Sequence, residues 1–243
     1  MGTTAVKYQG EELQLFSTAT NWKRYLAAVL GSYICGRVAE IGAGIGGSSV
    51  ALINERCSQW VCVEPDAVLV RELRGRLLGD GRGDERFAVV CGDIACIGDR
   101  SFDTILYLDV LEHIADDRAE VTAASRALAP GGRLVALCPA HQWLYIPFDR
   151  AIGHHRRYTG RDLAALTPPG IAAQRFFYLD SCGLILSAAN RALLRQDLPT
   201  PRQIVFWDRI VVPCSRRVDR FSAHRIGKSV VAVWRKPSAA GGG

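Results

Sequence analysis

The sequence has no run of about 18 to 20 apolar residues, the length that a helix needs to cross a bilayer. Its first residues also lack the basic stretch followed by an apolar one that marks a secretory signal. With 243 residues, of which 49% are hydrophobic, the chain can bury a substantial core. We therefore expect a soluble, cytoplasmic protein with one main domain and no internal repeat.

The sequence also lacks a C-x-x-C pair, although it contains 8 cysteines. Cys62, Cys91 and Cys138 lie within apolar runs of strand length, where cysteine behaves as a small hydrophobic residue. We expect these residues to be reduced thiols of the core. No metal site and no disulfide framework is predicted.

The net charge of +6 is distributed unevenly along the chain. Residues 1–140 carry 14 basic and 18 acidic side chains, whereas residues 141–243 carry 16 basic and 6 acidic ones. An acidic half suits a cationic ligand, and a basic half suits an anionic substrate, a phosphorylated carrier or an anionic membrane. A solvated surface rich in arginine is the alternative interpretation of the second half.

From residue 37 onward, short apolar runs alternate with segments of helical length, which predicts βαβ units and a parallel sheet. Seven strands are expected at 38–41, 60–63, 87–91, 104–108, 133–138, 174–178 and 229–234. Helices are expected near 46–56, over 67–78 and over 116–128, with Pro130-Gly131-Gly132 ending the last of them. The predicted fold class is α/β, a doubly wound, mostly parallel seven-stranded sheet.

The first strand is followed by a glycine-rich turn, Glu40-Ile-Gly-Ala-Gly-Ile-Gly-Gly47, that opens a helix. Glycines allow a tight turn and let a ligand approach the backbone, so this segment predicts a nucleotide-type cofactor site. Gly42, Gly44 and Gly47 also fit the G-x-G-x-x-G pattern of dinucleotide-binding proteins, and Glu64 lies about 20 residues further on. The turn alone therefore leaves the cofactor open between NAD and another nucleoside.

Acidic residues follow or end four successive strands of the predicted sheet: Glu40, Glu64, Asp93 and Asp109. Doubly wound sheets bind ligands at the carboxyl ends of their strands, so these groups should converge at one edge. Each of them alone could instead be a helix N-cap. An acid two residues before the first glycine would repel a pyrophosphate and favour a cationic cofactor.

These four motifs, in this order over roughly residues 35 to 140, resemble the class I S-adenosylmethionine-dependent methyltransferases of the small-molecule branch. The resemblance implies a Rossmann-like methyltransferase fold and S-adenosyl-L-methionine as the cofactor. It places Glu40 and the glycine turn at the methionine end, Glu64 at the ribose and Asp93 with Ile94 at the adenine. The full set of implied cofactor-binding residues is Glu40, Gly42, Ala43, Gly44, Gly46, Glu64, Pro65, Gly92, Asp93, Ile94, Asp109, Val110 and Leu111.

We expect the chain to divide into four parts. Residues 1–36 should form an N-terminal helical cover, and residues 37–140 should form the cofactor-binding core. Residues 141–237 should hold a substrate-side insertion, a helical elaboration and the closing strands, and residues 238–243 should be a disordered tail. The insertion is similar to that of a bacterial methyltransferase subgroup with Pro-Ala-His, Phe-Asp and Gly-His-x-Arg-Arg-Tyr patterns.

Methyl transfer to a hydroxyl group or a protonated amine requires a proton acceptor, which is usually histidine or a carboxylate. We expect His141 or His154 to be this base and Asp149 to orient it, with His113 as a weaker candidate. The expected substrate contacts are Trp143, Tyr145, His155, Arg156, Arg157 and Tyr158. For the arginine and histidine cluster, ion pairs with Asp149 or Asp162 that pin a solvated loop are the alternative.

The segment 204–221 mixes apolar residues and arginines and could pack in the core, cap the site, contact a partner or rest on a membrane. The predicted function is methylation, on oxygen by preference, of an anionic or amphipathic metabolite, a lipid-linked sugar or a natural-product intermediate. The alternatives are an NAD-dependent oxidoreductase and a non-catalytic, cofactor-binding regulatory or partner subunit. No specific nucleic-acid partner is expected, because the basic half alone gives only nonspecific attraction.

Overall fold

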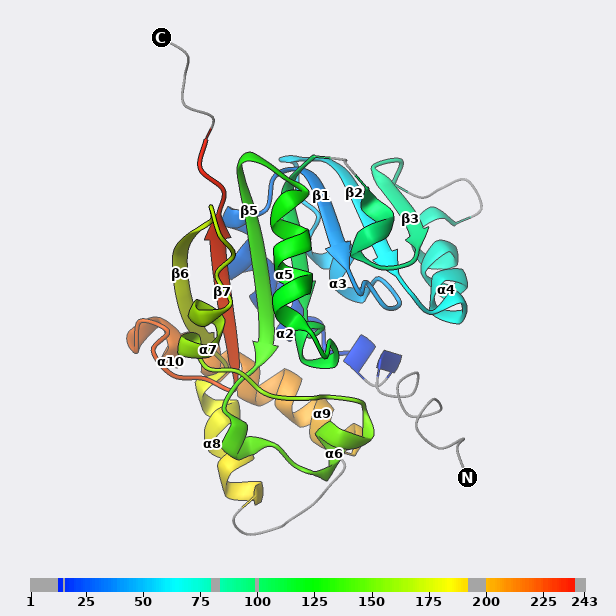
Figure 1. Ribbon diagram of the computed structural model, residues 1–243. Coiled ribbons are helices and arrows are strands. Elements are labelled where there is room, and N and C mark those ends of the chain that lie inside the picture. Colours follow the sequence, from blue (N-terminus) through cyan, green and yellow to red (C-terminus); the bar gives the residue numbers. More distant parts are fainter. Residues whose placement is uncertain (1–12, 15, 80–83, 99–100, 192–199, 239–243) are drawn as a thin grey trace, which may run out of the picture.

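The computed structural model describes residues 13–14, 16–79, 84–98, 101–191 and 200–238 (Figure 1). The predicted tail lies outside these residues apart from Ser238, as does most of the N-terminal cover before residue 16. Within the described ranges, no helix combines the length and the hydrophobicity that crossing a membrane would require.

The centre of the molecule is a seven-stranded sheet with the order β3-β2-β1-β4-β5-β7-β6. All strands run parallel except β7, which pairs antiparallel with both β5 and β6. The strands are β1 (Gly36–Ile41), β2 (Cys57–Glu64), β3 (Phe87–Cys91), β4 (Phe102–Leu108), β5 (Leu128–Pro139), β6 (Ala172–Leu179) and β7 (Ser229–Arg235). This mostly parallel α/β sheet confirms the predicted fold class.

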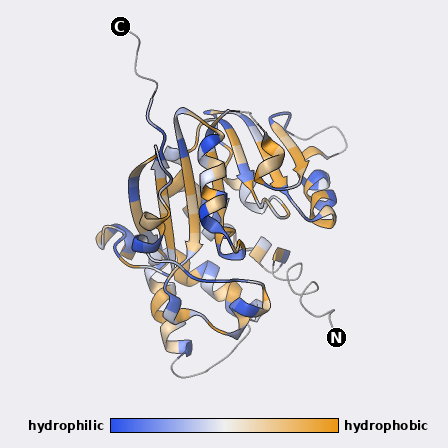
Figure 2. Cartoon of the chain, viewed as in Figure 1, coloured by the Kyte–Doolittle hydropathy of each residue, from blue (hydrophilic) through white to orange (hydrophobic). Residues whose placement is uncertain are grey.

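Alternation along the strands creates two hydrophobic layers. In β1, Ala39 and Ile41 face a layer that also contains Val121 of α5 (Asp117–Arg126) and residues of α7 (Gly160–Ala165). Val38 faces the opposite layer, formed with α2 (Thr20–Leu30), α3 (Gly47–Leu52), α4 (Ala67–Leu78) and α10 (Val212–Phe221). Figure 2 shows hydrophobic residues concentrated on the strands between these helices. Burial on both faces is what parallel strands require.

The predicted helix over 67–78 is α4, and it begins after the N-cap Asp66, whose carboxylate accepts two backbone N–H groups of the first turn. The helix expected over 116–128 ends earlier, at Arg126. Pro130-Gly131-Gly132 does not end this helix but lies inside β5, where the pairing with β4 shifts its register. A positive φ of 80° at Gly131 accommodates the irregularity, which glycine tolerates without a steric penalty.

Helical elements gather at the edge of the sheet to which the arrowheads of β1, β2 and β5 point (Figure 1). The insertion after β5 forms the 3₁₀ turn η4 (Gln142–Leu144) and α6 (Pro147–Ala151). Between β6 and β7, the chain forms α8 (Ser181–Ala189), α9 (Pro201–Phe206), the π-helical turn η6 (Trp207–Val211) and α10. Three further 3₁₀ turns are η1 (Gly31–Tyr33), η2 (Ile94–Ile97) and η3 (Leu111–His113). The predicted helical insertion before the last strand is therefore present.

Buried carboxylates tie the N-terminal helix α2 to the C-terminal helices. Asp208 of η6 accepts hydrogen bonds from the backbone N–H groups of Asn21 and Trp22, which begin α2. Asp219 of α10 accepts from the Tyr25 hydroxyl at 2.7 Å and from the backbone N–H of Asp180. These bonds fix the cover on the sheet next to the edge where the strands end.

The cysteines differ from the expectation at one of the three named positions. Cys62 and Cys138 are buried as predicted, whereas Cys91 is exposed at the end of the edge strand β3. The apolar run that suggested burial belongs to a strand with a neighbour on one side only. No disulfide is present among the eight cysteines, all of which lie in the described residues.

Candidate active site

The glycine turn after β1 has the backbone conformation that its composition predicted. Gly42, Gly44 and Gly46 have φ angles of 67°, 54° and 74°, in the left-handed region that favours glycine. A Cβ on Gly42 would lie 2.6 Å from a methyl group of Val110, and Gly46 is the N-cap of α3. Ala43, between them, is buried. The turn can therefore lie against Val110, just after β4, only because Gly42 has no side chain.

Glu64, the last residue of β2, is 6% exposed and supports the turn directly. Its two carboxylate oxygens accept the backbone N–H of Gly44 at 2.8 Å and that of Asp66 at 3.0 Å. Burial raises the pKa of Glu64, and these two hydrogen bonds oppose the rise. A carboxylate has about four lone-pair sites, so Glu64 retains the capacity to accept from two further hydroxyl groups.

Glu40 lies on the α3 side of the sheet, on the same face of β1 as Val38. Its side chain is 2% exposed and accepts a hydrogen bond from the Trp60 indole N–H at 2.9 Å. Burial raises the pKa of Glu40 to about 7, although hydrogen bonds from Ser49 and Trp60 oppose the rise. The structure thus places this carboxyl beneath α3, the helix that the turn opens, where Ser49 of that helix is one of its hydrogen-bond partners.

Asp93 follows β3 and is the N-cap of η2, where its carboxylate accepts the N–H of Ala95 at 2.9 Å. This is the capping role that a lone aspartate after a strand suggests. Gly92 has a φ of 149°, and its N–H donates to the carbonyl of Glu64. Ile94 is largely buried and Pro65 is exposed. The ends of β2 and β3 are thereby joined beside the glycine turn.

Asp109 follows β4 with a φ of 56°, an uncommon conformation for a residue other than glycine. Asp109 is exposed to solvent. Even so, desolvation by the surrounding protein raises the pKa of its carboxyl to about 6, and the positive charges of His154, Lys228 and Arg157 oppose this rise. Strained residues of this kind concentrate at functional sites. Val110 packs against Gly42, whereas Leu111 is fully buried in the core and presents no side-chain surface to a ligand.

His154 and Asp149, which the sequence placed in one insertion, form a hydrogen-bonded pair. Nδ1 of His154 lies 3.1 Å from Oδ1 of Asp149, and the side chain of His154 is 10% exposed. Arg157 contacts both oxygens of Asp149 at 3.0 Å. Burial would raise the pKa of Asp149, but the bond from His154 and the charge of Arg157 hold it below its usual value. Asp149 therefore remains ionised and orients the imidazole.

The other ring nitrogen of His154 faces η3, the turn after β4. Nε2 lies 3.9 Å from Oε1 of the buried Glu112, and the rings of His154 and His113 meet edge to face at 4.5 Å. Burial, together with the charges of His154 and His155, lowers the pKa of His113 to about 4. Glu112, His113 and His154 hold potential ligand atoms within 4.8 Å of one another. This group of three residues was not predicted from the sequence, because its members come from two segments about 40 residues apart.

His141 occupies a different environment from His154. Its Nε2 lies 3.1 Å from the carbonyl oxygen of Gly227, to which it donates a hydrogen bond. Its ring stacks on Tyr178 with an interplanar angle of 1°. Burial lowers the pKa of His141, and the Gly227 bond opposes this change. Asp149 contacts His154 and Arg157, so it does not orient His141.

The remaining predicted substrate contacts fall into two groups. Arg156 forms an ion pair with Asp117 at 2.6 Å, and the hydroxyl of Tyr158 donates to the same carboxylate at 2.7 Å. Tyr158 is only 2% exposed, so the structure places it in the core, and we do not assign it a substrate contact. His155 and Trp143 are exposed, whereas the hydroxyl of Tyr145 is bonded to the carbonyl of His154. The alternative interpretation is therefore right for the ion pair of Arg157 with Asp149, whereas Asp162 accepts hydrogen bonds from Thr159 and the pair of Arg156 with Asp117 was not predicted.

Lys228 also lies at this edge of the sheet, and it was not predicted from the sequence. It directly precedes β7, and its carbonyl accepts the N–H of Ala140 while its own N–H donates to Asp180. Its ammonium lies 5.7 Å from the centre of the Trp207 ring, and burial lowers its pKa while Asp180 opposes the change. Because β7 is antiparallel, its amino end meets the carboxyl ends of its neighbours. A basic residue directly before the last strand is therefore the sequence feature that could have identified Lys228 as part of the site.

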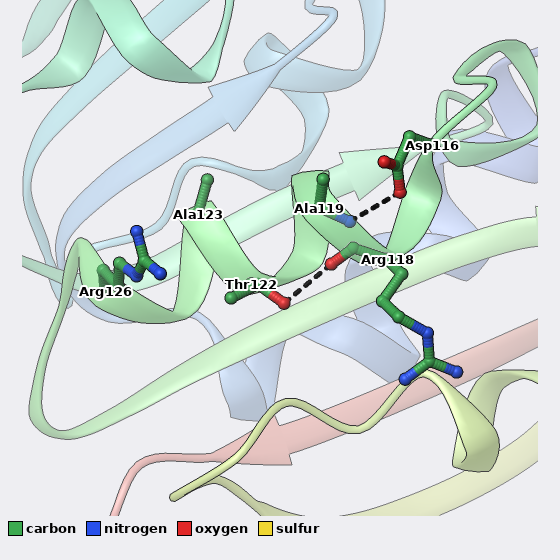
Figure 3. Close-up of a pocket in the computed structure, with 6 residues that line it drawn as sticks. All are labelled: Asp116, Arg118, Ala119, Thr122, Ala123 and Arg126. Atoms are coloured by element: carbon green, nitrogen blue, oxygen red, sulfur yellow. Dashed lines mark hydrogen bonds between the residues drawn. The ribbon is translucent and has the colours of Figure 1, made fainter.

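A separate hollow runs along the outer surface of α5, away from the glycine turn (Figure 3). Asp116 accepts the N–H of Ala119, Thr122 donates to the carbonyl of Arg118, and the Arg118 guanidinium donates to the carbonyl of Ala165. None of the predicted site residues lines it. We assign the candidate site to the ends of the strands.

The doubly wound sheet, the glycine turn and the acidic residues at the strand ends indicate a cofactor-binding protein of the Rossmann-like class. The comparison with known families agrees with this class. Residues 39–134 match the family described as methyltransferase domain. This match covers the glycine turn and the ends of β2, β3 and β4. This part of the chain is thus similar to a methyltransferase domain, and it lies on a Rossmann-like sheet.

Two curated proteins resemble part of the chain. The ubiquinone biosynthesis O-methyltransferase of Idiomarina loihiensis is 32% identical over 98 residues, which are 40% of either chain. A protein named probable tocopherol O-methyltransferase, chloroplastic, from Oryza sativa subsp. japonica is 31% identical over 108 residues, 43% of this chain and 29% of that protein. The match therefore spans less than half the length of both curated relatives.

Solved structures resemble the fold along nearly the whole chain. The [4+2]-cyclase SpnF has a TM-score of 0.59 at 15% identity, and the alignment covers 95% of both chains. The N-methyltransferase NodS from Bradyrhizobium japonicum, solved with S-adenosyl-L-homocysteine, has a TM-score of 0.56 at 15% identity, with 90% of this chain and 86% of that chain covered. A cyclase and a methyltransferase share this fold, so the reaction must be argued from the site.

The residues present fit S-adenosylmethionine, the methyl donor that a methyltransferase domain implies. The turn over Gly42, Gly44 and Gly46 offers backbone without side chains, and Glu64 beside it has acceptor capacity for a pair of hydroxyl groups. The exposed carboxyl group of Asp109 lies at the end of β4 next to the turn and suits a ligand that carries an ammonium and a sulfonium, whereas Glu40 is buried beneath α3. The donor set therefore matches a cationic nucleoside better than a pyrophosphate.

Proposed function

We propose that this chain transfers a methyl group from S-adenosylmethionine to a hydroxyl group of a small-molecule acceptor, with His154 as the proton acceptor. The observation that carries the proposal is the Asp149–His154 pair, 3.1 Å apart, beside the methyltransferase domain. The pattern Gly153-His154-His155-Arg156-Arg157-Tyr158 further supports membership in the bacterial subgroup that it resembles.

Bound S-adenosylmethionine supplies a methyl group on a positively charged sulfur, which is already a good electrophile. The protein therefore contributes mainly alignment and the exclusion of water. In the tautomer that donates Nδ1–H to Asp149, the lone pair of His154 lies on Nε2 and accepts the acceptor's hydroxyl proton. An oxygen–carbon bond forms as the carbon–sulfur bond breaks, and S-adenosylhomocysteine leaves. Asp149 and Glu112 stabilise the resulting imidazolium, and the exchange of the proton with solvent resets the base.

The acceptor that this site favours is an amphipathic or anionic molecule with a hydroxyl group. Lys228 and the exposed His155 border the edge, and the exposed Trp143 offers an apolar contact. The names of the two curated relatives, an enzyme of ubiquinone biosynthesis and a tocopherol O-methyltransferase, support oxygen methylation of a molecule with an apolar tail. Suitable acceptors are phenols with isoprenoid tails, lipid-linked sugars and natural-product intermediates.

The test combines a panel of these acceptors with methyl-tritiated cofactor and two variants. We expect His154→Gln to reduce kcat by about 100-fold or more while leaving the affinity for S-adenosylhomocysteine unchanged, as loss of a general base does. His141→Gln is the comparison variant, since its Nε2 already serves Gly227, and it should have a smaller effect. Equal turnover of His154→Gln and the unaltered protein would remove the proposed base. No labelled product from any acceptor or cell extract would count against methyl transfer itself.

The glycine spacing also suits an NAD-dependent oxidoreductase, and a regulatory subunit would retain the cofactor site without the reaction. Calorimetric titration with S-adenosylhomocysteine and with NAD tests the oxidoreductase alternative, because only a methyltransferase site should bind S-adenosylhomocysteine. The assay with methyl-tritiated cofactor tests the regulatory-subunit alternative, because such a subunit would form no labelled product. The match to a methyltransferase domain over residues 39–134 favours the proposed reaction over both.

A further inference from the structure

The helices between β6 and β7 include one continuous helical rod with two different faces. Thr200 caps its start in a capping box with Gln203, and α9, η6 and α10 follow one another without a break to Phe221. The buried positions are Ile204, Asp208, Val211, Val212, Ser215 and Asp219. Their spacing of three or four residues marks one side of a helix, and this side packs on the protein.

The opposite side of the rod carries large apolar side chains in water. Phe206 and Ile210 are both 53% exposed, Val218 is 42% exposed and Phe221 is 91% exposed. Together with the exposed Cys214, they recur every three or four residues and form one stripe, which we call the apolar stripe. Isolated exposed hydrophobic residues are ordinary, but a stripe along a whole helix marks a contact surface.

The charges that flank the apolar stripe all have one sign. The exposed ionisable residues of the rod are Arg202, Arg209, Arg216, Arg217 and Arg220. Its two acidic residues, Asp208 and Asp219, are 4% and 0% exposed and bind α2 on the inner side. The outer surface therefore combines apolar and basic side chains, and both acidic side chains of the rod are buried on its inner side. Arginine stems can also cover apolar surface while their heads remain in the aqueous layer.

We propose that the apolar stripe and its five arginines dock the protein on a membrane surface that contains anionic phospholipids. The outer surface of the rod combines two features of an interfacial helix, namely large exposed apolar side chains and basic side chains. Anionic lipid headgroups are the partners that match both properties at once, since a neutral bilayer satisfies only the apolar part. The helix α8, which packs against α10, extends the surface with Ile185 and Leu186, both exposed.

The rod reaches the candidate active site through Trp207. Trp207, within the rod, donates its indole N–H to Asp180 at 2.8 Å and lies beneath the ammonium of Lys228. Figure 1 shows α8 and α9 at the edge where β5 ends. A rod that rests on a bilayer would hold this edge close to the lipid, where amphipathic molecules reside. Membrane docking itself does not depend on the proposed methyl transfer.

The experiment is flotation of the full chain with vesicles of phosphatidylcholine alone and of phosphatidylcholine with phosphatidylglycerol. We expect the protein to float with the anionic vesicles and to be released by high salt, because exposed charges are screened within a Debye length. Replacing Arg217 and Arg220 by Gln should weaken binding about fivefold per arginine. Phe221→Ser, at an almost fully exposed position, should weaken it about tenfold or more.

Matched control variants are Val68→Ser and Arg71→Gln on α4. Val68 is 61% exposed and Arg71 is exposed, so they remove the same chemical groups far along the sheet, next to β3. These controls should float like the unaltered chain. Thermal unfolding of each variant confirms that folding is preserved, as expected for exposed positions.

The proposal is overturned if the unaltered chain does not bind anionic vesicles, or if Phe221→Ser and the control variants bind equally well. Light scattering adds a further outcome. A dimer that Phe221→Ser converts to a monomer, without any vesicle binding, would assign the apolar stripe to a second copy of the chain. If the unaltered chain floats with anionic vesicles but methylates no acceptor, the proposed methyl transfer is refuted and the docking surface stands.

Discussion

Replacing Glu40 by Gln is expected to stabilise the cofactor-free protein at neutral and alkaline pH. Glu40 is 2% exposed, and burial raises its pKa from 4.5 to about 7. Holding this carboxyl in the ionised form therefore costs the folded state about 3 kcal/mol relative to the unfolded chain. Glutamine has the same shape, retains an acceptor for the Trp60 indole N–H and carries no charge.

The pH dependence follows from the direction of the shift. Because the folded-state pKa is the higher one, the stability contributed by Glu40 is fully present below 4.5 and is lost as the pH rises to about 7. The difference between variant and unaltered protein should accordingly be small near pH 4.5, grow up to pH 7 and stay constant above it. A difference of about 3 kcal/mol corresponds to a rise in Tm of roughly 5–10 °C for a chain of this size.

Thermal unfolding by calorimetry across this pH range measures the effect, and titration with S-adenosylhomocysteine measures the functional consequence. We expect the more stable Glu40→Gln protein to bind the cofactor product more weakly, because it lacks the negative charge that attracts an ammonium group. A variant that is less stable than the unaltered protein at pH 8 would refute the reasoning, since it would mean that the carboxylate is stabilised in place.

Three further predictions concern the same edge of the sheet. Gly46→Ala should destabilise the protein by about 1–3 kcal/mol in denaturant unfolding, because the position has a φ of 74° and a Cβ there would lie 2.6 Å from a methyl group of Leu73. Glu64→Gln should weaken S-adenosylhomocysteine binding about tenfold or more by calorimetry, because it removes a charged acceptor that also holds the Gly44 N–H. Dialysis against a chelator should leave turnover unchanged, since a metal ion on Nε2 of His154 would occupy the nitrogen that accepts the proton. Activity lost to the chelator and restored by Zn²⁺ would instead identify Glu112, His113 and His154 as metal ligands.

The regular part of the fold was predictable because local patterns and the global fold agree there. The helix over 67–78 has an amphipathic repeat and a good N-cap in Asp66, and it was located to the residue. The strands were located with ends that differ by a few residues, except at β5. There, Pro130-Gly131-Gly132 resembles a helix stop, but pairing with β4 overrides the local signal and draws these residues into the sheet.

The candidate site was predictable only as a set of residues at one edge. Which histidine pairs with Asp149 depends on the turn of α6, and the sequence left His141 and His154 open. The side of the sheet that Glu40 faces follows from its alternation with Ala39, but nothing in the sequence says which side the cofactor occupies. Lys228 joins the site only because β7 runs antiparallel, which no local pattern indicates.

The bonds from Asp208 to the start of α2 carry a consequence for the order of folding. The helix at the beginning of the chain obtains its N-terminal cap from a residue 187 positions later. On the ribosome, α2 therefore emerges without its cap, and its first turn gains this stabilisation of about 1 kcal/mol only after the C-terminal helices have been synthesised. Such a distant closure is slow relative to local helix formation, so we expect the cover to dock after the central strands have paired. Until then, the hydrophobic face of β1 and β2 that α2 shields remains open to solvent and to chaperones.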